Sequence, residues 1–430
     1  MFRTFFIRNV PIALVVAVLL TLAACGGGGG GGGSSGSGSP TGTVSVYPRF
    51  AYVANDNDNS VSVYAVNATT GRLTFTGKVS TGTNPWSVTV DPSGRYAYVA
   101  NEGSATVSQY MIGTNGSLTP MATPTVITGT FPESVTVDPS GQYAYVANYV
   151  GNTISQYTIG AGGSLTPNAP ITVATPAGPY SLAMSHGASP ATVVPKYAYV
   201  ANYLSNTVSE YTIGTNGSLT PMATPTVNTE TDPVSVAVDP SGQYAYVANY
   251  LSNTVSQYTI GTNGSLTPMA TPTVSTGTGP WSVTVDPSGR YSYVTSGTNN
   301  TVSQYTIGTN GSLTPMATPT VSAGTGPESV TVDPSGQYAY VANYSSNTVS
   351  QYTIGTNGSL TPMATSTVIT GTEPVFVTVD PSGRYAYVAN EGNATVSQYT
   401  IGTNGSLTPM ATASISVGNP ISIITTGSYQ

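Results

Sequence analysis

Polar and apolar side chains alternate along short segments of this chain, and the alternation recurs in a unit of about 47 residues. In one unit, residues 282–285 are Ser-Val-Thr-Val, and residues 301–307 are Thr-Val-Ser-Gln-Tyr-Thr-Ile. A period of two places one side of each segment in a core and the other on a polar surface, as in a β-strand. The unit shows no 3.6-residue helical period, so we expect an all-β structure.

Turn sequences divide each unit into four expected strands. The first strand ends at Asp-Pro-Ser-Gly (residues 286–289), which favours a tight turn, and the second strand covers residues 291–294. The third strand, residues 301–307, is followed by an Asn-Gly dipeptide, the strongest short signal for a hairpin. A fourth strand then runs through residues 312–322. Four antiparallel strands in a repeated unit are typical of a β-propeller blade.

The unit occurs eight times, marked by the phrase Tyr-x-Tyr-Val-Ala-Asn or a close variant. Its second tyrosine is found at Tyr52, Tyr98, Tyr145, Tyr199, Tyr246, Tyr293, Tyr340 and Tyr387. A fixed period of this length indicates copies of one supersecondary unit packed on each other. The first unit lacks its leading strand, and residues 420–425 at the C-terminus have the sequence of that strand. We therefore expect an eight-bladed propeller over residues 44–427, closed by pairing of its N- and C-terminal strands, with seven blades as the alternative.

The composition limits the possible partners. Charged residues make up only 6% of the chain and the formal net charge is −7, while 49 Gly, 32 Pro and 30 Tyr suit turns and a large β core. Nucleic acid is not expected as a partner, because its binding depends on clustered Lys and Arg. No cofactor or metal ion is predicted: residues 56–59 (Asp-Asn-Asp-Asn) resemble the start of a calcium loop but lack its later Gly and Glu.

The N-terminus has the parts of a secretory signal peptide, residues 1–24. Arg3 and Arg8 precede an apolar run, and the Leu-Ala-Ala-Cys sequence ending at Cys25 resembles a bacterial lipobox, in which the cysteine is acylated and becomes the mature N-terminus. Cys25 is the only cysteine, and two or three acyl chains would anchor it stably to a membrane. An ordinary secretory signal is the alternative.

Residues 25–43 are the expected lipidated cysteine and a Gly- and Ser-rich tether, which spans roughly 20 Å on average as a flexible coil. Gly26 stands where an Asp would favour retention at the inner membrane. We therefore expect a lipid-anchored protein of the bacterial cell envelope, at the outer membrane. Residues 428–430 are expected to form a short C-terminal tail.

The Tyr-Val-Ala-Asn phrases, the Asp-Pro-Ser-Gly turns and the Asn-Gly-Ser-Leu-Thr hairpins resemble the YVTN repeats of the lactonase-like β-propeller family, which includes 6-phosphogluconolactonase. The resemblance implies a propeller, usually of seven blades, and an activity on lactones. It also implies Arg and His after the proline that starts a blade, where they handle a phosphorylated substrate. Here that position holds Trp, Glu, Tyr, Val and Ile, so a phosphorylated lactone is not expected.

Comparison of the eight units separates two faces. The turns after the first and third strands are nearly constant, whereas the loops after the second strands and the linkers between blades differ among units. In a four-stranded meander these variable segments lie at the same end, which we call the variable rim; the opposite end is the constant face. Binding residues tend to lie on loops held by a rigid scaffold, so we expect the site on the variable rim.

The candidate site residues follow either the proline that starts a blade or the second strand. They are Trp86, Glu133, Tyr180, Trp281 and Glu328 at the first position, and Glu102 and Glu391 at the second. Because Trp86 and Trp281 are four units apart, as are the two glutamates of the first position, each pair should face across the central channel. This rim suits a sugar, a cation or an extended polypeptide; alternatively, its rings only fill gaps between blades.

Three functions remain open. The first is a binding or interaction module at the envelope, with the membrane as partner of Cys25 and a protein or carbohydrate on the variable rim. The second is a lactonase-like hydrolase of a non-phosphorylated lactone, and the third is a structural repeat protein. No catalytic residue is assigned, because Glu133 and Glu328 should be farther apart than the roughly 5–10 Å of paired glycosidase carboxylates. His186, the only histidine, is expected in a longer loop of the constant face, residues 185–196.

Overall fold

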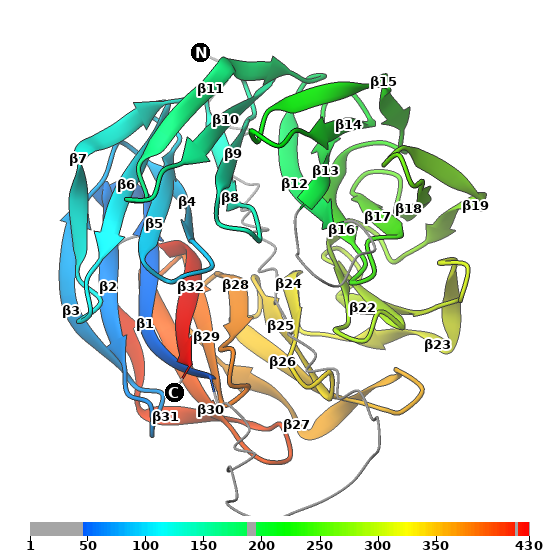
Figure 1. Ribbon diagram of the computed structural model, residues 1–430. Helices are drawn as coiled ribbons and strands as arrows, with labels where there is room; N and C mark the ends of the chain where they lie inside the picture. The colour runs from blue at the N-terminus through cyan, green and yellow to red at the C-terminus, as the bar shows by residue number, and fades with distance from the viewer. Residues whose placement is uncertain (1–45, 187–194, 418–419, 430) are drawn as a thin grey trace, which may run out of the picture.

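The computed structural model describes residues 46–186, 195–417 and 420–429 and shows eight four-stranded antiparallel sheets arranged as a ring (Figure 1). We number these sheets as blades 1 to 8, beginning with the one that contains β1 and continuing along the chain. The predicted all-β, eight-bladed propeller is therefore confirmed, and the alternative of seven blades is wrong. The signal peptide, Cys25 and the Gly/Ser tether lie outside the described residues.

Each blade has its first strand innermost, next to the channel. The innermost strands of blades 1 to 8 are β32 (Pro420–Tyr429), β4 (Pro85–Val90), β8 (Pro132–Val137), β12 (Pro179–His186), β16 (Pro233–Val238), β20 (Pro280–Val285), β24 (Pro327–Val332) and β28 (Pro374–Val379). The second strands are β1 (Val46–Asn55), β5 (Tyr96–Asn101), β9 (Tyr143–Asn148), β13 (Pro195–Asn202), β17 (Tyr244–Asn249), β21 (Tyr291–Ser296), β25 (Tyr338–Asn343) and β29 (Tyr385–Asn390).

The third and fourth strands complete each blade toward the outside of the ring. The third strands are β2 (Ser60–Val66), β6 (Thr106–Ile112), β10 (Thr153–Ile159), β14 (Thr207–Ile213), β18 (Thr254–Ile260), β22 (Thr301–Ile307), β26 (Thr348–Ile354) and β30 (Thr395–Ile401). The outermost strands are β3 (Leu73–Ser80), β7 (Leu118–Ile127), β11 (Leu165–Ala174), β15 (Leu219–Asn228), β19 (Leu266–Ser275), β23 (Leu313–Ser322), β27 (Leu360–Ile369) and β31 (Leu407–Ser416). A 3-10 turn, η1 (Asp56–Asp58), follows β1, and no described helix has the length and apolar character to cross a membrane.

The ring is closed within blade 1, as the sequence predicts. β32 at the C-terminus pairs with β1 near the N-terminus, with Tyr52 opposite Ile424, and the two strands lie side by side in Figure 1. β32 continues to Tyr429, so the expected tail from residue 428 is part of this strand up to Tyr429. The innermost strands contact each other all around the ring, including β28 with β32 and β32 with β4. The closure leaves no open inner seam.

Tyrosines hold neighbouring blades together, which gives the repeated Tyr-x-Tyr phrase a physical reason. The second tyrosine of each phrase is fully buried, and its hydroxyl donates to the carbonyl oxygen of a hairpin glycine in the next blade, as Tyr246 does to Gly311 at 2.7 Å. The first tyrosine packs on the same glycine: a Cβ on Gly311 would lie 2.0 Å from the Tyr244 ring. A third-strand tyrosine, such as Tyr258, donates to the outermost strand of the preceding blade.

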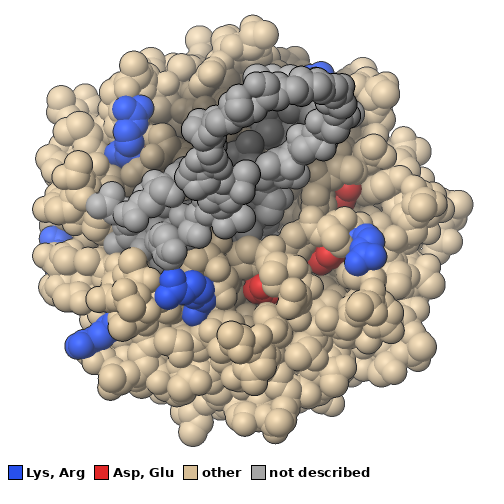
Figure 2. Space-filling view, turned by 60° about the horizontal axis from the view of Figure 1, so that its bottom comes forward, with Lys and Arg blue, Asp and Glu red and all other residues tan. Residues whose placement is uncertain are grey.

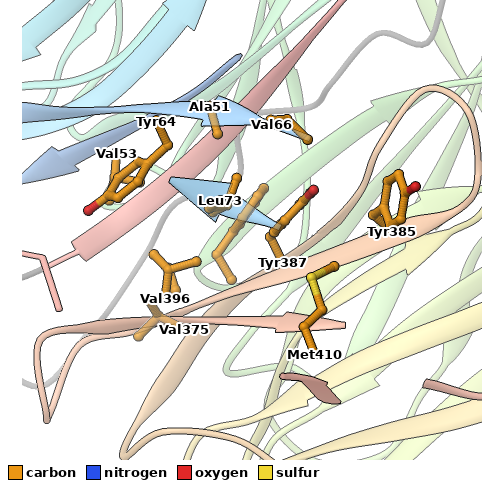
Figure 3. Close-up of a cluster of buried hydrophobic side chains, with 12 residues drawn as sticks. Ala51, Val53, Tyr64, Val66, Leu73, Val375, Tyr385, Tyr387, Val396 and Met410 are labelled. Atoms are coloured by element: carbon orange, nitrogen blue, oxygen red, sulfur yellow. The ribbon is translucent and has the colours of Figure 1, made fainter. Parts of the chain in front are cut away.

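One buried apolar cluster lies where blade 8 meets blade 1. Figure 3 shows Tyr385 and Tyr387 of β29 with Leu73 of β3 and Met410 of β31. Valines and tyrosines at the corresponding positions form similar clusters at the other interfaces of the ring. The hydrophobic core is therefore distributed between the blades rather than concentrated at the centre.

The Asp-Pro-Ser-Gly turns of the constant face are held by their aspartate. In blade 6, Asp286 Oδ1 accepts hydrogen bonds from the backbone N–H groups of Arg290 and Tyr291 at 2.8 and 2.7 Å, and its Oδ2 accepts from Ser288. Gly289 closes the turn at φ +71°, a conformation that favours glycine. These aspartates are structural, which explains why they recur almost unchanged.

His186 does not lie in a loop, contrary to the sequence prediction. Blade 4 extends its first two strands beyond the usual turn, so His186 is the last residue of β12 and is paired with Pro195 of β13. Among the described residues, no group of three or more His, Cys, Asp or Glu is placed to hold a metal ion. On the face drawn in Figure 2, Lys and Arg side chains stand apart and form no continuous basic patch.

Candidate ligand site at the channel mouth

Each blade presents two variable residues next to each other at the variable rim. One follows the proline that starts the innermost strand, and the other follows the last residue of the second strand. The backbone holds the two positions together, because the N–H of the second residue donates to the carbonyl oxygen before the proline. Glu102 donates in this way to Asn84 at 2.8 Å, and Tyr149 to Phe131 at 2.8 Å.

The loops of the variable rim are fixed to the next linker by asparagine side chains. Asn253 has a left-handed backbone with φ +60°, and its Oδ1 accepts the N–H of Gly279 at 2.8 Å. Asn152 and Asn206 make the corresponding bonds to blades 4 and 5. The rim is thus a set of short loops pinned by hydrogen bonds.

The five candidate residues after the proline all lie on innermost strands. Trp86 is on β4, Glu133 on β8, Tyr180 on β12, Trp281 on β20 and Glu328 on β24. The order of innermost strands around the ring places blades 2 and 6 opposite each other, and blades 3 and 7 likewise. The two tryptophans and the two glutamates therefore occupy opposing blades, as their spacing in the sequence indicates.

Four of these side chains have a buried polar atom without a hydrogen-bond partner in the protein. The atoms are Trp86 Nε1, Glu133 Oε2, the Tyr180 hydroxyl and Glu328 Oε2. Tyr180 itself is only 8% exposed. Buried polar groups are normally hydrogen-bonded, since an unmet group costs free energy. Of the ten such atoms among the described residues, these four belong to the residue after a blade-starting proline.

The glutamates of the mouth favour their protonated forms. Burial raises the pKa of Glu133 well above its usual value, and the neighbouring Glu102 raises it further. Burial also raises the pKa of Glu328, with added effects from Glu391 and Glu373. The candidate residues Glu102 and Glu391 are therefore each brought close to a glutamate of the first position.

Tyr180 connects the two acidic groups electrostatically. Burial raises the pKa of its hydroxyl, and both Glu133 and Glu328 raise it further. All three residues follow a blade-starting proline on an innermost strand, so they belong to the same rim of the channel. Glu102 is itself perturbed: burial and then Asp56 raise its pKa to about 7.

Aromatic rings line the mouth over blades 3 to 6. The centroid of the Tyr180 ring lies 6.0 Å from those of Tyr149 and Tyr203, and the Trp281 ring packs edge-on at 5.2 Å against Tyr250. These contacts are in the usual range for aromatic pairs. They show that part of the expected gap-filling does occur, although it leaves the Tyr180 hydroxyl without a protein partner.

Sequence reasoning missed the backbone conformation of the residue before the starting proline. Phe131, Asp232 and Glu373 adopt left-handed φ values of 57°, 58° and 54°, where the corresponding residues of three other units are Gly178, Gly279 and Gly326. A non-glycine residue is strained there by roughly 1–2 kcal/mol. The signal was present as glycine at the same place in other units.

A closed ring of four-stranded meanders with its variable loops at one end defines a β-propeller. The sequence matches the family described as lactonase, 7-bladed beta-propeller, over residues 42–131, 105–186, 134–296 and 192–428. The chain belongs to this lactonase family, with eight blades where the family description has seven. The resemblance of its repeats to this family is thereby confirmed.

Solved structures share the fold at low sequence identity. A putative 6-phosphogluconolactonase from Bacteroides fragilis is 20% identical, with a TM-score of 0.60, over 90% of this chain and 100% of that one. The periplasmic gluconolactonase PpgL of Pseudomonas aeruginosa is 19% identical, with a TM-score of 0.60, over 89% and 99%. Apo AztD from Citrobacter koseri is 13% identical, with a TM-score of 0.59, over 90% and 99%. No curated protein matches the chain.

Proposed function

We propose that this chain is a ligand-binding propeller of the bacterial cell envelope, with its site at the channel mouth. The observation that carries the proposal is the set of four buried, unpartnered polar atoms on Trp86, Glu133, Tyr180 and Glu328. Ligand pockets combine apolar walls with a few convergent polar groups, and the rings of this mouth supply the walls. A bound molecule would complete the hydrogen bonding that the protein leaves open.

The chemistry of the mouth suits a neutral, polyhydroxylated ligand such as a sugar. Trp86 Nε1 can only donate, whereas the Tyr180 hydroxyl and a protonated glutamate can each donate and accept. A hydroxyl group serves both needs, but a simple cation cannot accept from the indole. An anion such as a phosphorylated sugar is disfavoured, because neither of the two variable positions of the rim holds a Lys or Arg that could offset its charge.

Hydrolysis of a neutral lactone is the second candidate function. The family and the neighbours named gluconolactonases support it, as do two carboxyls whose raised pKa values suit a general acid. Glu133 and Glu328 lie on opposing blades, however, which favours two separate binding contacts over one catalytic pair. We therefore place binding first.

Calorimetry on the mature chain with Cys25→Ser tests the site. The probes are methyl glucoside, gluconate, spermidine and glucono-1,5-lactone, and we expect the neutral compounds to bind. Glu133→Gln and the double variant Trp86→Ala, Trp281→Ala should weaken binding, whereas the exposed Glu230→Gln should not. If no probe binds, or if the double variant binds as the parent does, a structural repeat protein becomes the better description.

Proton release from glucono-1,5-lactone separates binding from hydrolysis. Turnover above the spontaneous rate that is lost in Glu133→Gln or Glu328→Gln would establish a hydrolase. Binding without turnover would support the binding module. The unfolding temperatures of these variants show whether a loss of binding or turnover results from a folding defect.

The membrane anchor is a separate part of the proposal and rests on the lipobox-like sequence at Cys25. Labelling of cells with a radioactive fatty acid should mark the full chain, and Cys25→Ser should abolish the label. Fractionation should then place the labelled chain in the outer membrane. A label-free chain secreted in soluble form would instead indicate an ordinary signal peptide.

A further inference from the structure

We propose that the variable rim of blades 3 to 5 is a docking surface for a partner polypeptide that carries aliphatic and basic side chains. Three large aliphatic residues are exposed there: Val150, Leu204 and Leu251, at 48%, 57% and 61%. Each is the second residue of the four-residue loop between the second and third strands. Together with the preceding tyrosines they form what we call the apolar crescent: Tyr149, Val150, Tyr203, Leu204, Tyr250 and Leu251.

The crescent is specific to three consecutive blades. The other five loops have the same length but carry small or polar residues at the second position: Asn57, Gly103, Thr298, Ser345 and Gly392. In the ring, β12 contacts both β8 and β16, so the three apolar loops belong to consecutive blades. An exposed apolar patch of this kind on a soluble domain marks an interaction site.

The loops of the crescent are fixed, so the exposure of their aliphatic side chains is a property of the folded surface. Asn152 Oδ1 accepts the N–H of Gly178 at 3.0 Å, and Asn206 Oδ1 accepts the N–H of Asp232 at 2.9 Å. Asn253 makes the third bond of this type. A preorganised surface loses little conformational entropy on binding.

The charges around the crescent indicate a basic partner. Asp232 is hydrogen-bonded to the Tyr203 hydroxyl and also raises the pKa of Tyr149, and Glu230 is exposed in the same linker. In the described part of the chain, the variable loops and linkers of blades 3 to 5 contain no Lys or Arg. Complementary charge on a partner would therefore be positive.

Other occupants fit less well. A second copy of the chain would bring acidic groups against acidic groups, because the crescent has no cation of its own. An anionic lipid surface would be repelled by Asp232 and Glu230. A free sugar would gain no hydrogen bonds from Val150, Leu204 or Leu251. A polypeptide with alternating aliphatic and basic residues satisfies both the apolar and the charged parts.

Fluorescence anisotropy with three labelled octapeptides on the mature Cys25→Ser chain tests this surface. The peptides alternate Lys with Leu, Lys with Ser, or Glu with Leu. We expect only the Lys-Leu peptide to bind, with weaker binding at high salt. Equal binding of the Lys-Ser peptide, or no binding of the Lys-Leu peptide, overturns the proposal.

Two triple variants supply the matched comparison. Val150→Ser, Leu204→Ser and Leu251→Ser introduce the residue that blade 7 has at this position, and should weaken binding of the Lys-Leu peptide by about tenfold or more. Met111→Thr, Ile127→Thr and Ile369→Thr remove exposed apolar side chains from other strands and should leave binding unchanged. Equal losses of binding in the two triple variants would show non-specific adsorption and would overturn the assignment. The assignment would also be overturned if the parent chain formed a dimer, or bound phosphatidylglycerol vesicles, and only the crescent variant lost that property. Unfolding temperatures show that both variants are folded.

Discussion

The hydroxyl of Tyr387 donates a 2.7 Å hydrogen bond to the carbonyl oxygen of Gly71, 316 residues away in the sequence. The same bond joins Tyr246 to Gly311 between blades that follow each other directly, also at 2.7 Å. The interface between the last blade and the first is therefore built from the same contact as the interfaces between blades that follow each other in the chain. Together with the pairing of β32 and β1 within blade 1, this contact completes the ring.

Removal of the hydroxyl between blades 8 and 1 should cost as much stability as removal of the corresponding hydroxyl between blades 5 and 6. We expect Tyr387→Phe and Tyr246→Phe each to lower the free energy of unfolding by about 1 kcal/mol, the usual net value of one hydrogen bond. Urea denaturation followed by tyrosine fluorescence measures both. A cost confined to Tyr246→Phe would show that the contact between blades 8 and 1 carries no stability.

The hairpin glycines should tolerate no side chain, for a reason beyond backbone conformation. Gly311→Ala places a Cβ 2.0 Å from the Tyr244 ring, whereas Gly336→Ala, at a similar positive φ, meets nothing closer than 3.9 Å. Both changes should cost roughly 1–2 kcal/mol in backbone strain. Gly311→Ala should cost about 1–3 kcal/mol more from overpacking. Equal unfolding free energies for the two variants would contradict the tight contact with Tyr244.

The sequence was sufficient for the blade pattern because strands and turns are local. The Asp-Pro-Ser-Gly and Asn-Gly signals fix each meander within one unit, and the missing first strand identified the closure through residues 420–425. The partner of Tyr246 could not be predicted in this way, because Gly311 belongs to the next blade. Long-range pairs of this kind depend on how blades pack.

The candidate site was predictable in part for the same reason. Register alone placed Trp86, Glu133 and Glu328 at the mouth, since each follows the first proline of an innermost strand. The effect of Glu328 on Tyr180, three blades away, depends on the width and curvature of the ring. The exposure of Leu204 could not be predicted either, because an aliphatic residue in a loop usually packs inward.

Glu210 should destabilise the protein at neutral pH. It replaces the glutamine that other blades carry in the third strand, is only 1% exposed, and accepts a hydrogen bond from the backbone N–H of Leu266. The glutamine also donates to its own outermost strand, as Gln257 does to the carbonyl of Thr271 at 2.6 Å. An ionised carboxylate cannot donate, and burial raises the pKa of Glu210.

The direction of its pH dependence follows from that raised pKa. The folded state binds the proton of Glu210 more tightly than the unfolded state, so stability is greatest below the unfolded pKa and falls as pH rises through the folded pKa. Glu210→Gln should raise the unfolding temperature more at pH 7 than at pH 4. The reverse change, Gln257→Glu, should lower the unfolding temperature, and by more at pH 7 than at pH 4. If the pH profile of Glu210→Gln ran parallel to that of the wild type, this assignment would be contradicted.

Glu102 should titrate near neutral pH and should make the stability of the variable rim depend on pH. Burial and Asp56 raise its pKa from 4.5 to about 7. The stability that its protonated form contributes is complete below about pH 4.5 and is lost as pH rises through about 7. Glutamine does not titrate. The unfolding temperature of Glu102→Gln relative to that of the wild type should therefore rise between about pH 4.5 and pH 7, and the difference should be constant at higher pH.

The exposed Glu230→Gln serves as the comparison for Glu102→Gln, because it removes one negative charge from the same rim without removing a buried carboxyl. Scanning calorimetry of both variants from pH 4 to pH 9 separates the local effect from the change in net charge. If Glu102 is perturbed by its surroundings, only Glu102→Gln should show a difference that grows up to neutral pH. Identical profiles for the two variants would mean that Glu102 is solvated like an ordinary surface carboxyl. Glu102 would then not be the buried neighbour that raises the pKa of Glu133.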